Sequence, residues 1–163
     1  APTGSGKTLT YLLPIISQLK QEEEGVGPLT ASQRPRAIVL TATKELVVQG
    51  RQVGKQISHH SKLKVEGLGI GRSLKEEKQS IINGVDLLMS TYSRLSMQLR
   101  QNNLYTSHLK WIVIDETDTL FETGRIEEVF KEVVNRTKNM PEGPRILLTG
   151  TTSSPELKKL LAS

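Results

Sequence analysis

The sequence predicts an α/β domain whose mainly parallel β-sheet carries helices on both faces. Segments with the composition of strands alternate along its 163 residues with segments whose apolar side chains recur at helical spacing. This alternation is typical of βαβ units. Several strand segments are continuously apolar, as strands buried on both faces of a parallel sheet are. The length fits a single domain, expected to span residues 1–163 without an internal repeat.

The first helix is predicted over residues 7–23, directly after a short glycine-rich segment. Apolar side chains recur along it at the spacing of a buried helix: Leu9, Tyr11, Leu12, Leu13, Ile15, Ile16 and Leu19. Pro14 lies in its interior, and because an interior proline costs about 3 kcal/mol, we expect a kink there. A flexible surface loop over residues 25–35, rich in glycine and proline, follows this helix.

Five strands are predicted from runs of apolar and β-branched residues, at positions 36–41, 64–70, 85–90, 111–115 and 145–149. Further helical patterns separate these strands and follow the last one, at positions 44–58, 73–83, 92–101, 126–138 and 154–161. Gly84 is suited to end the helix before it, and Ser154 followed by Pro155 is suited to begin the last helix.

Composition excludes several classes of protein. The sequence has no cysteine, which excludes a disulfide framework and thiolate zinc sites, and its three histidines lack the spacing of metal ligands. No apolar run has the length of a membrane-spanning helix, and no signal peptide is visible. We therefore expect a soluble intracellular protein with no membrane partner. The nucleus, the nucleolus, the cytoplasm and an organelle such as the mitochondrion are not distinguished.

The net charge of +5 is unevenly spread along the chain. Residues 34–110 hold 13 Lys or Arg against 5 Asp or Glu, whereas the other positions hold 9 against 12. A basic segment of this kind fits a surface that binds a polyanion, but solvated helix faces explain it equally well. Because aromatic residues make up only 4% of the sequence, nucleic acid would be held by sugar and phosphate rather than by base stacking. Tyr92 is the exception considered, with burial as its alternative.

Residues 1–8, Ala-Pro-Thr-Gly-Ser-Gly-Lys-Thr, predict a phosphate-binding loop. Its glycines let the backbone curl so that N–H groups point toward phosphate oxygens. Lys7 reaches the β- and γ-phosphates, and the Thr8 hydroxyl is suited to bind Mg²⁺. The general pattern has glycine where this chain has Ala1, and a glycine-rich turn before an ordinary helix is the alternative. The expected nucleotide-binding residues are Thr3, Gly4, Ser5, Gly6, Lys7 and Thr8.

Asp115 ends the strand predicted at residues 111–115, and Glu116 follows it. Ligands of open parallel sheets bind at the carboxyl ends of the strands, so we expect these two acids beside the phosphate loop. Asp115 is suited to hold Mg²⁺ together with Thr8, and Glu116 is suited to polarise an attacking water. Pairs of acids after strands are common, and this pair is informative because the phosphate loop accompanies it.

Six motifs in consistent order resemble those of DEAD-box RNA helicases, and over its whole length the chain is similar to the first RecA-like domain of that family. Two motifs belong to the expected nucleotide site: residues 1–8 match A-x-T-G-S-G-K-T, and Asp115-Glu116-Thr117-Asp118 resembles D-E-A-D. Three lie between them: Thr43-Lys44-Glu45-Leu46 with Gln49 resembles P-T-R-E-L-A-x-Q, Gly71 and Ser73 fall at G-G-x-S, and residues 91–95 resemble T-P-G-R-L. The last is Thr149-Gly150-Thr151, which resembles S-A-T.

The resemblance implies an ATP-dependent RNA helicase, or an RNA-remodelling ATPase, that uses ATP and Mg²⁺. Lys7 and Glu116 would then be catalytic, Thr8 and Asp115 would bind the metal, and Asp118 would couple the nucleotide site to the RNA face through Thr149 or Thr151. RNA backbone would be bound, with little sequence preference, at Thr43, Lys44, Gly71, Thr91, Ser93 and Arg94. A second RecA-like domain of the same protein would supply arginine fingers, so little ATP hydrolysis is expected from residues 1–163 alone. Protein partners are left open.

Departures from the family pattern lie mainly in the RNA-side motifs. Ile70 replaces the first glycine of the glycine pair, Tyr92 and Ser93 replace a proline and a glycine, and Thr117 replaces the alanine of D-E-A-D. The residues that would contact ATP are intact, so the chain is interpreted as a divergent member. A DNA translocase of the same superfamily and an RNA-binding scaffold that no longer hydrolyses ATP are the alternatives.

Overall fold

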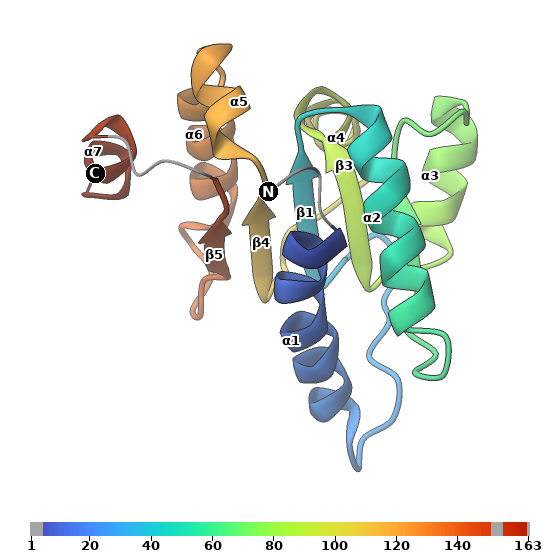
Figure 1. Ribbon diagram of the computed structural model, residues 1–163. Coiled ribbons are helices and arrows are strands. Elements are labelled where there is room, and N and C mark those ends of the chain that lie inside the picture. Colours follow the sequence, from blue (N-terminus) through green and yellow to red (C-terminus); the bar gives the residue numbers. More distant parts are fainter. Residues whose placement is uncertain (1–4, 151–154, 163) are drawn as a thin grey trace.

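A five-stranded parallel sheet forms the centre of the computed structural model, which describes residues 5–150 and 155–162 (Figure 1). The strands are β1 (Ala37–Thr41), β2 (Val65–Gly67), β3 (Leu87–Thr91), β4 (Trp111–Ile114) and β5 (Arg145–Leu148). They lie in the order β2-β3-β1-β4-β5, and each neighbouring pair is parallel. The predicted α/β fold with a parallel sheet is therefore confirmed.

Seven helices connect or follow these strands within the described ranges: α1 (Ser5–Glu23), α2 (Lys44–Ile57), α3 (Leu74–Ile82), α4 (Tyr92–Arg100), α5 (Thr117–Glu122), α6 (Ile126–Thr137) and α7 (Pro155–Ala162). Six of them agree with the predicted helices, and α5 was not predicted. Ser154, the expected N-cap of α7, lies outside the described residues. No helix in the described part of the chain combines the length and apolarity needed to cross a bilayer.

The continuously apolar strands bury side chains on both faces of the sheet. All five residues of β1 are buried, and they alternate between two hydrophobic cores. Ala37 and Val39 pack into the core formed with α1 and α2, whereas Ile38 and Leu40 pack into the core that includes side chains of α4 and α6. Figure 1 shows α1 and α2 over one face of the sheet and α4 and α6 over the other. This arrangement explains why the strands carry no polar alternation.

Helix ends follow the signals in the sequence. Ser73 caps α3 in a capping box, in which its hydroxyl accepts the Glu76 amide and the Glu76 carboxylate accepts the Ser73 amide. Gly84 follows that helix with φ +96°, in the left-handed region that favours glycine. The helix α1 continues as one α-helix through Pro14, whose ring is exposed to solvent.

Two expectations about element limits were wrong. The strand expected at residues 64–70 is only three residues long, because the backbone turns away at Gly69 and Gly71, which have φ values of +81° and +76°. Residues 117–122, between strand and helix, form the short helix α5. Its six residues carry no long apolar periodicity, so pattern alone did not distinguish them from a loop.

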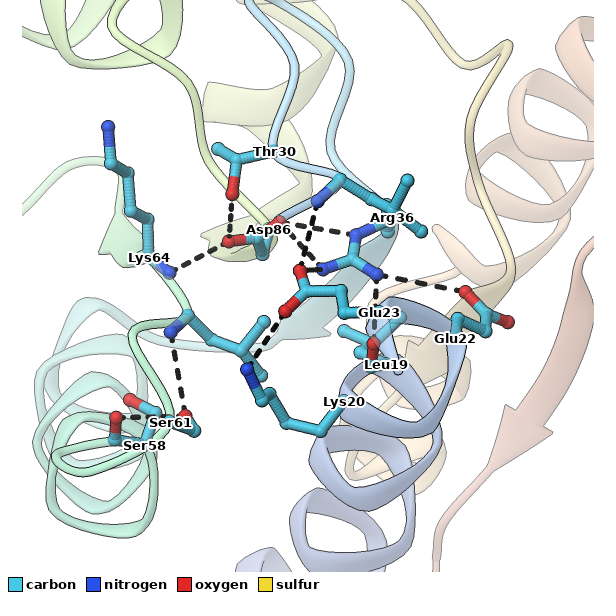
Figure 2. A network of polar contacts seen from close by, with 12 residues as sticks. Leu19, Lys20, Glu22, Glu23, Thr30, Arg36, Ser58, Ser61, Lys64 and Asp86 are labelled. Atoms are coloured by element: carbon cyan, nitrogen blue, oxygen red, sulfur yellow. Dashed lines mark hydrogen bonds and ion pairs between the residues drawn. The ribbon is translucent and has the colours of Figure 1, made fainter. Parts of the chain in front are cut away.

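A buried ionic cluster ties together the edge of the sheet at which the strands begin (Figure 2). The Arg36 guanidinium is 3% exposed and contacts the Glu23 carboxylate at 2.6 Å and the Asp86 carboxylate at 2.9 Å. The second oxygen of Asp86 accepts hydrogen bonds from the Thr30 hydroxyl and the Lys64 amide. The cluster therefore joins the end of α1 to the segments that precede β1, β2 and β3.

Candidate functional site

The candidate site lies at the opposite edge of the sheet, where the parallel strands end. The acids Asp115 and Glu116 directly follow β4, and Thr149 directly follows the neighbouring strand β5. The N-terminal half of α1 reaches the same place, because Tyr11 on this helix contacts Asp115. The structure therefore places the helix that follows the predicted phosphate loop next to the acidic motif.

The described part of the phosphate loop forms the first turn of α1. Thr3 and Gly4 lie outside the described residues, and Ser5 begins the helix. At Gly6, a built Cβ atom would find no heavy atom within 4 Å, so the backbone here is open to a ligand. Lys7 and Thr8 follow and are half-buried. Because the first N–H groups of a helix lack intrahelical acceptors, this turn is suited to bind anionic oxygens.

Asp115 is buried, at 6% exposure, and both of its carboxylate oxygens accept hydrogen bonds. Its Oδ2 atom accepts the Tyr11 hydroxyl at 3.0 Å. Its Oδ1 atom accepts the Glu116 amide at 2.9 Å and the Thr149 hydroxyl. Three donors from α1, the β4–α5 turn and the end of β5 therefore fix the orientation of one carboxylate.

Tyr11 is a site residue that the sequence analysis assigned to the core. Burial raises the pKa of Tyr11, and the negative charge of Asp115 raises it further, so its hydroxyl remains a protonated donor. The Thr8 side chain acts in the opposite direction and lowers the pKa of Tyr11. The signal in the sequence was its spacing, since positions 8 and 11 are three residues apart and share a helix face.

Glu116 occupies a strained turn between β4 and α5. Its φ is +51°, which is the left-handed region that a non-glycine residue rarely adopts. Its amide donates to Asp115 and, at 3.2 Å, to the Thr149 hydroxyl oxygen. Its carboxylate makes no capping hydrogen bond to α5, although Glu116 is the N-cap residue. The half-buried side chain therefore does not cap the N-terminus of α5.

Thr149 joins the two motifs at the ends of β4 and β5. Its hydroxyl donates to the Asp115 carboxylate, and the expected coupling of Asp118 to Thr149 or Thr151 stays a prediction. Thr117 adds two bonds to the Thr149 carbonyl, one from its amide at 2.8 Å and one from its hydroxyl at 3.0 Å. Thr151 lies outside the described residues, so the Asp118–Thr151 contact stays a prediction.

Gly150 lets the two motifs approach each other closely. A Cβ atom built at this position would lie 2.5 Å from the Thr117 hydroxyl oxygen and 2.6 Å from an Asp118 carboxylate oxygen. The resemblance places an alanine at both positions 117 and 150. In this chain the larger Thr117 and the smaller Gly150 are therefore complementary in volume.

The donor set at this edge fits Mg²⁺ bound together with a nucleotide. Within the described residues, no three or more Asp, Glu, His or Cys side chains gather as a metal cluster. Mg²⁺ in nucleotide sites is held by one or two protein oxygens, phosphate oxygens and water. The Thr8 hydroxyl on α1 and the Asp115 carboxylate, which Tyr11 of the same helix contacts, would supply two such protein oxygens.

The residues expected to bind RNA lie at the same edge, at the ends of β1, β2 and β3. Thr43 is the N-cap of α2, where its hydroxyl accepts the Leu46 amide at 3.3 Å. Thr91 is the N-cap of α4, and its hydroxyl makes no capping bond. The side chains or backbone of Lys44, Gly71 and Ser93 are exposed. A recess of about 420 Å³ next to them is lined in part by hydroxyls and one cation, from Thr41, Thr91, Ser93, Thr119, Thr123 and Arg125.

Arg94 is held by protein contacts rather than projecting freely into solvent. Its guanidinium Nε atom donates to the Glu77 carboxylate at 2.9 Å, and its Nη2 atom donates to the Arg72 carbonyl at 3.3 Å. Glu77 is fully buried and also accepts the Gly69 amide at 2.5 Å and the Gln98 side chain at 3.0 Å. Glu77, which the sequence analysis missed, therefore joins α3 and α4 to the loop after β2.

Tyr92 is a core residue, so the structure decides between the two interpretations of this aromatic side chain. It is 9% exposed, and its hydroxyl donates to the Glu132 carboxylate at 2.8 Å. Burial and this carboxylate raise the pKa of Tyr92 to about 12. Its ring is packed in the hydrophobic core beneath α4 and α6 and is not available to stack on a base.

Several arginines of the basic segment, residues 34–110, form ion pairs within the protein. Arg36, Arg51, Arg72 and Arg94 each pair with a carboxylate. Eight further basic residues of this segment are exposed: Lys44, Lys55, Lys62, Lys64, Lys75, Lys78, Arg100 and Lys110. The positive charge is therefore partly structural, and the exposed remainder is free to attract a polyanion.

Comparison with known proteins gives a family match over nearly the whole chain. The model of the family described as DEAD/DEAH box helicase matches residues 1–160. DEAD-box ATP-dependent RNA helicase 39 of Arabidopsis thaliana is 32% identical over 163 residues, which cover 98% of this chain and 26% of that protein. Nucleolar RNA helicase 2-A of Xenopus laevis is 33% identical over 153 residues, covering 93% and 20%. The chain thus spans about a quarter or less of these relatives.

Two solved structures share this fold. The yeast DEAD-box splicing factor Prp28 aligns with a TM-score of 0.83 and 27% identity, covering 99% of this chain and 38% of that one. A hypothetical ATP-dependent RNA helicase from Sulfolobus tokodaii aligns with a TM-score of 0.79 and 25% identity, covering 99% and 43%. In both, the matching region is a part of a longer chain.

Proposed function

Because the chain belongs to the DEAD/DEAH box helicase family, we propose that it forms the ATP-binding RecA-like domain of an ATP-dependent RNA helicase. The enzyme would hydrolyse ATP to unwind short RNA duplexes or to remodel RNA–protein complexes. One observation carries the proposal: the N-terminal half of α1 lies against the acidic turn after β4, with Asp115 hydrogen-bonded to Tyr11 on that helix. Phosphates bound at the start of α1 would thereby lie next to the proposed catalytic carboxylate.

The nucleotide would be held mainly by the first turn of α1. Backbone N–H groups of residues 3–8 would bind the phosphate oxygens, and Lys7 would carry a positive charge to the β- and γ-phosphates. Thr8 and Asp115 would hold Mg²⁺, which when bound neutralises charge that develops on the phosphates. Glu116 would orient the attacking water and accept its proton. Its strained backbone supports this role, because it frees the carboxylate from capping α5.

RNA would cross the ends of β1, β2 and β3. The exposed Thr43, Lys44, Gly71 and Ser93, together with Thr91, offer hydroxyls, amides and a cation suited to a sugar–phosphate backbone. The hydroxyl-lined recess beside Thr91 lies on the same path. Since these groups read no base edge, we expect little sequence preference.

A second RecA-like domain of the same protein would complete the enzyme. The curated relatives are several times longer than this chain, which leaves room for such a domain. It would supply arginine fingers, which raise the rate of phosphoryl transfer by roughly 10³-fold or more. An enzyme of this kind would work inside the cell, where ATP and RNA are both present.

The test is the ATPase activity of the full-length protein with and without RNA. We expect single-stranded RNA to stimulate hydrolysis more strongly than DNA of the same length and sequence. Lys7→Ala should abolish Mg²⁺–ATP binding, whereas Lys131→Ala, which removes an exposed lysine from α6, should leave it unchanged. Equal stimulation by DNA would favour a DNA translocase. Binding of ATP and RNA without any hydrolysis would favour a scaffold.

A further inference from the structure

We propose that Tyr11 is a positioning residue, which acts through Asp115 and sets the affinity of the site for Mg²⁺. The inference rests on the proposed function, because Asp115 is taken to hold Mg²⁺ beside ATP. It goes beyond that function by assigning a task to a side chain of the apolar helix face. Tyr11 would not touch the nucleotide or the reacting atoms.

The geometry isolates one hydrogen bond. Tyr11 is 2% exposed, and its hydroxyl donates to Asp115 Oδ2 at 3.0 Å across 104 positions of sequence. Its ring packs in the core between α1 and the sheet, so the hydroxyl has little freedom to move. A donor fixed in this way holds its acceptor in one rotamer.

The two oxygens of Asp115 are supported unequally. Oδ1 accepts two described donors, the Glu116 amide and the Thr149 hydroxyl. Oδ2 accepts one described donor, the Tyr11 hydroxyl. Without that hydroxyl, the carboxylate could rotate about the Oδ1 contacts, and Oδ2 would lose its partner in a buried place.

Tyr11 also connects Asp115 to the helix that carries Thr8. Thr8 and Tyr11 lie three residues apart on α1 and share a helix face. The hydrogen bond from Tyr11 to Asp115 thus relates the positions of the two protein groups suited to Mg²⁺. Groups that orient a metal ligand from outside commonly change metal affinity by 10–100-fold when removed.

The experiment titrates Mg²⁺ against ATP binding by the full-length protein, with a fluorescent ATP analogue as the probe. Tyr11→Phe keeps the ring and removes the hydroxyl. We expect the midpoint in Mg²⁺ to rise roughly tenfold, while nucleotide affinity measured in EDTA stays unchanged. Tyr92→Phe is the matched control, because it also removes a hydroxyl that donates to a carboxylate, Glu132, away from the site. Its Mg²⁺ midpoint should equal that of the wild type.

A double variant tests whether Tyr11 acts through Asp115. Adding Tyr11→Phe to Asp115→Asn should shift the Mg²⁺ midpoint no further than Asp115→Asn alone. The inference is overturned if Tyr11→Phe leaves the midpoint unchanged, or if Tyr92→Phe shifts it equally. Wild-type ATP binding that ignores Mg²⁺ would overturn the proposed metal site as well, which separates the two failures.

Discussion

At the scale of single residues, Asp115 and Glu116 are adjacent in sequence but differ in surroundings. Asp115 is buried and accepts three hydrogen bonds, so its position is fixed. Glu116 has a left-handed backbone conformation, which costs a non-glycine residue about 1–3 kcal/mol. Its carboxylate makes no capping hydrogen bond to the start of α5. The turn therefore separates the expected tasks of the two carboxylates, metal binding and water activation.

Glu116→Gln should slow hydrolysis by orders of magnitude while leaving binding intact. The amide keeps the shape of the side chain but accepts no proton, and general-base catalysis contributes roughly 10²–10⁴-fold to a rate. We expect RNA-stimulated hydrolysis to fall by about that factor, measured by phosphate release, with ATP and RNA affinities retained. Glu122→Gln changes an exposed acid at the end of α5 and should behave as wild type. Normal turnover in Glu116→Gln would show that another group activates water.

Gly150→Ala should destabilise the protein because the new Cβ atom would collide with the Thr117 hydroxyl. Overpacking of this kind costs about 1–3 kcal/mol, and any rotation of Thr117 would break its bond to the Thr149 carbonyl. Urea unfolding measures the loss. Adding Thr117→Ala should restore part of the stability, since it removes the colliding hydroxyl. Strictly additive losses in the double variant would contradict the contact.

The sequence allowed roles to be proposed for Lys7, Asp115 and Glu116 because each belongs to a motif whose residue types are dictated by phosphate or metal chemistry, and these roles stay predictions. The contact of Tyr11 with Asp115 was not predicted, because a tyrosine in an apolar helical segment has the pattern of a core residue. The role of Glu77 was not predicted, because acidic residues are common in the first turn of a helix, where they interact favourably with its dipole. Which donors these two side chains meet depends on strands far away in the sequence, and no local pattern contains that information.

At the scale of elements, the helices α3 and α4 are joined through Glu77 and Arg94. Glu77 accepts hydrogen bonds from the loop after β2, from Arg94 and from Gln98 on α4. The loop that contains Gly71 and the start of α4 are thereby held in fixed relation. Both belong to the edge proposed to bind RNA, so this carboxylate would support the proposed RNA path from within the protein.

Arg94→Ala should therefore lower stability as well as RNA affinity. Hydrogen bonds to a charged group contribute about 1.5–3 kcal/mol, and we expect a loss within this range in urea unfolding. RNA binding, followed by fluorescence anisotropy in a salt titration, should weaken for all sequences alike. Arg100→Ala removes an exposed arginine from the last turn of the same helix and should leave stability unchanged. A loss of RNA affinity without loss of stability would mean that Arg94 contacts RNA alone.

Element limits were predictable where side-chain periodicity was strong and unpredictable where the backbone turned early. The helices α2 and α6 carry long amphipathic patterns and matched closely. The strand β2 ended before Leu68 because Gly69 takes a left-handed conformation, which leaves no trace in hydropathy. The helix α5 is too short for a period to show.

At the scale of the whole molecule, the Arg36 cluster should make stability depend on acidity. Burial alone would raise the pKa of Glu23, but hydrogen bonds from Lys20 and the Leu29 amide, with the charge of Arg36, hold it below its ordinary value. A lowered pKa stabilises the fold above the ordinary glutamate range, and this contribution is lost as the pH falls through the folded-state pKa. The ordinary value is about 4.3.

We expect the free energy of unfolding in urea to decline as the pH is lowered from about 5. Glu23→Gln removes the titrating group and should flatten this decline, at the cost of lower stability near neutral pH. Glu24→Gln changes the exposed neighbouring acid and should keep the wild-type profile. A Glu23→Gln profile parallel to that of the wild type would show that other carboxylates dominate.

The order of the strands is the property of the whole molecule that the sequence could not provide. The alternation of strand and helix segments predicted a parallel sheet. It did not predict the order β2-β3-β1-β4-β5, in which β1 lies between β3 and β4 although both are far from it in sequence. That order brings the ends of β1, β3 and β4 side by side. It thereby places the groups proposed to bind RNA at the same edge as the acidic turn.

The close fit of Thr117 against Gly150 also makes the two positions interdependent, although they lie 33 residues apart. The side chain that position 150 can carry depends on the side chain at position 117, because the two would occupy the same space. A library that varies both positions together should therefore yield more folded variants with larger side chains at position 150 than one that varies position 150 alone.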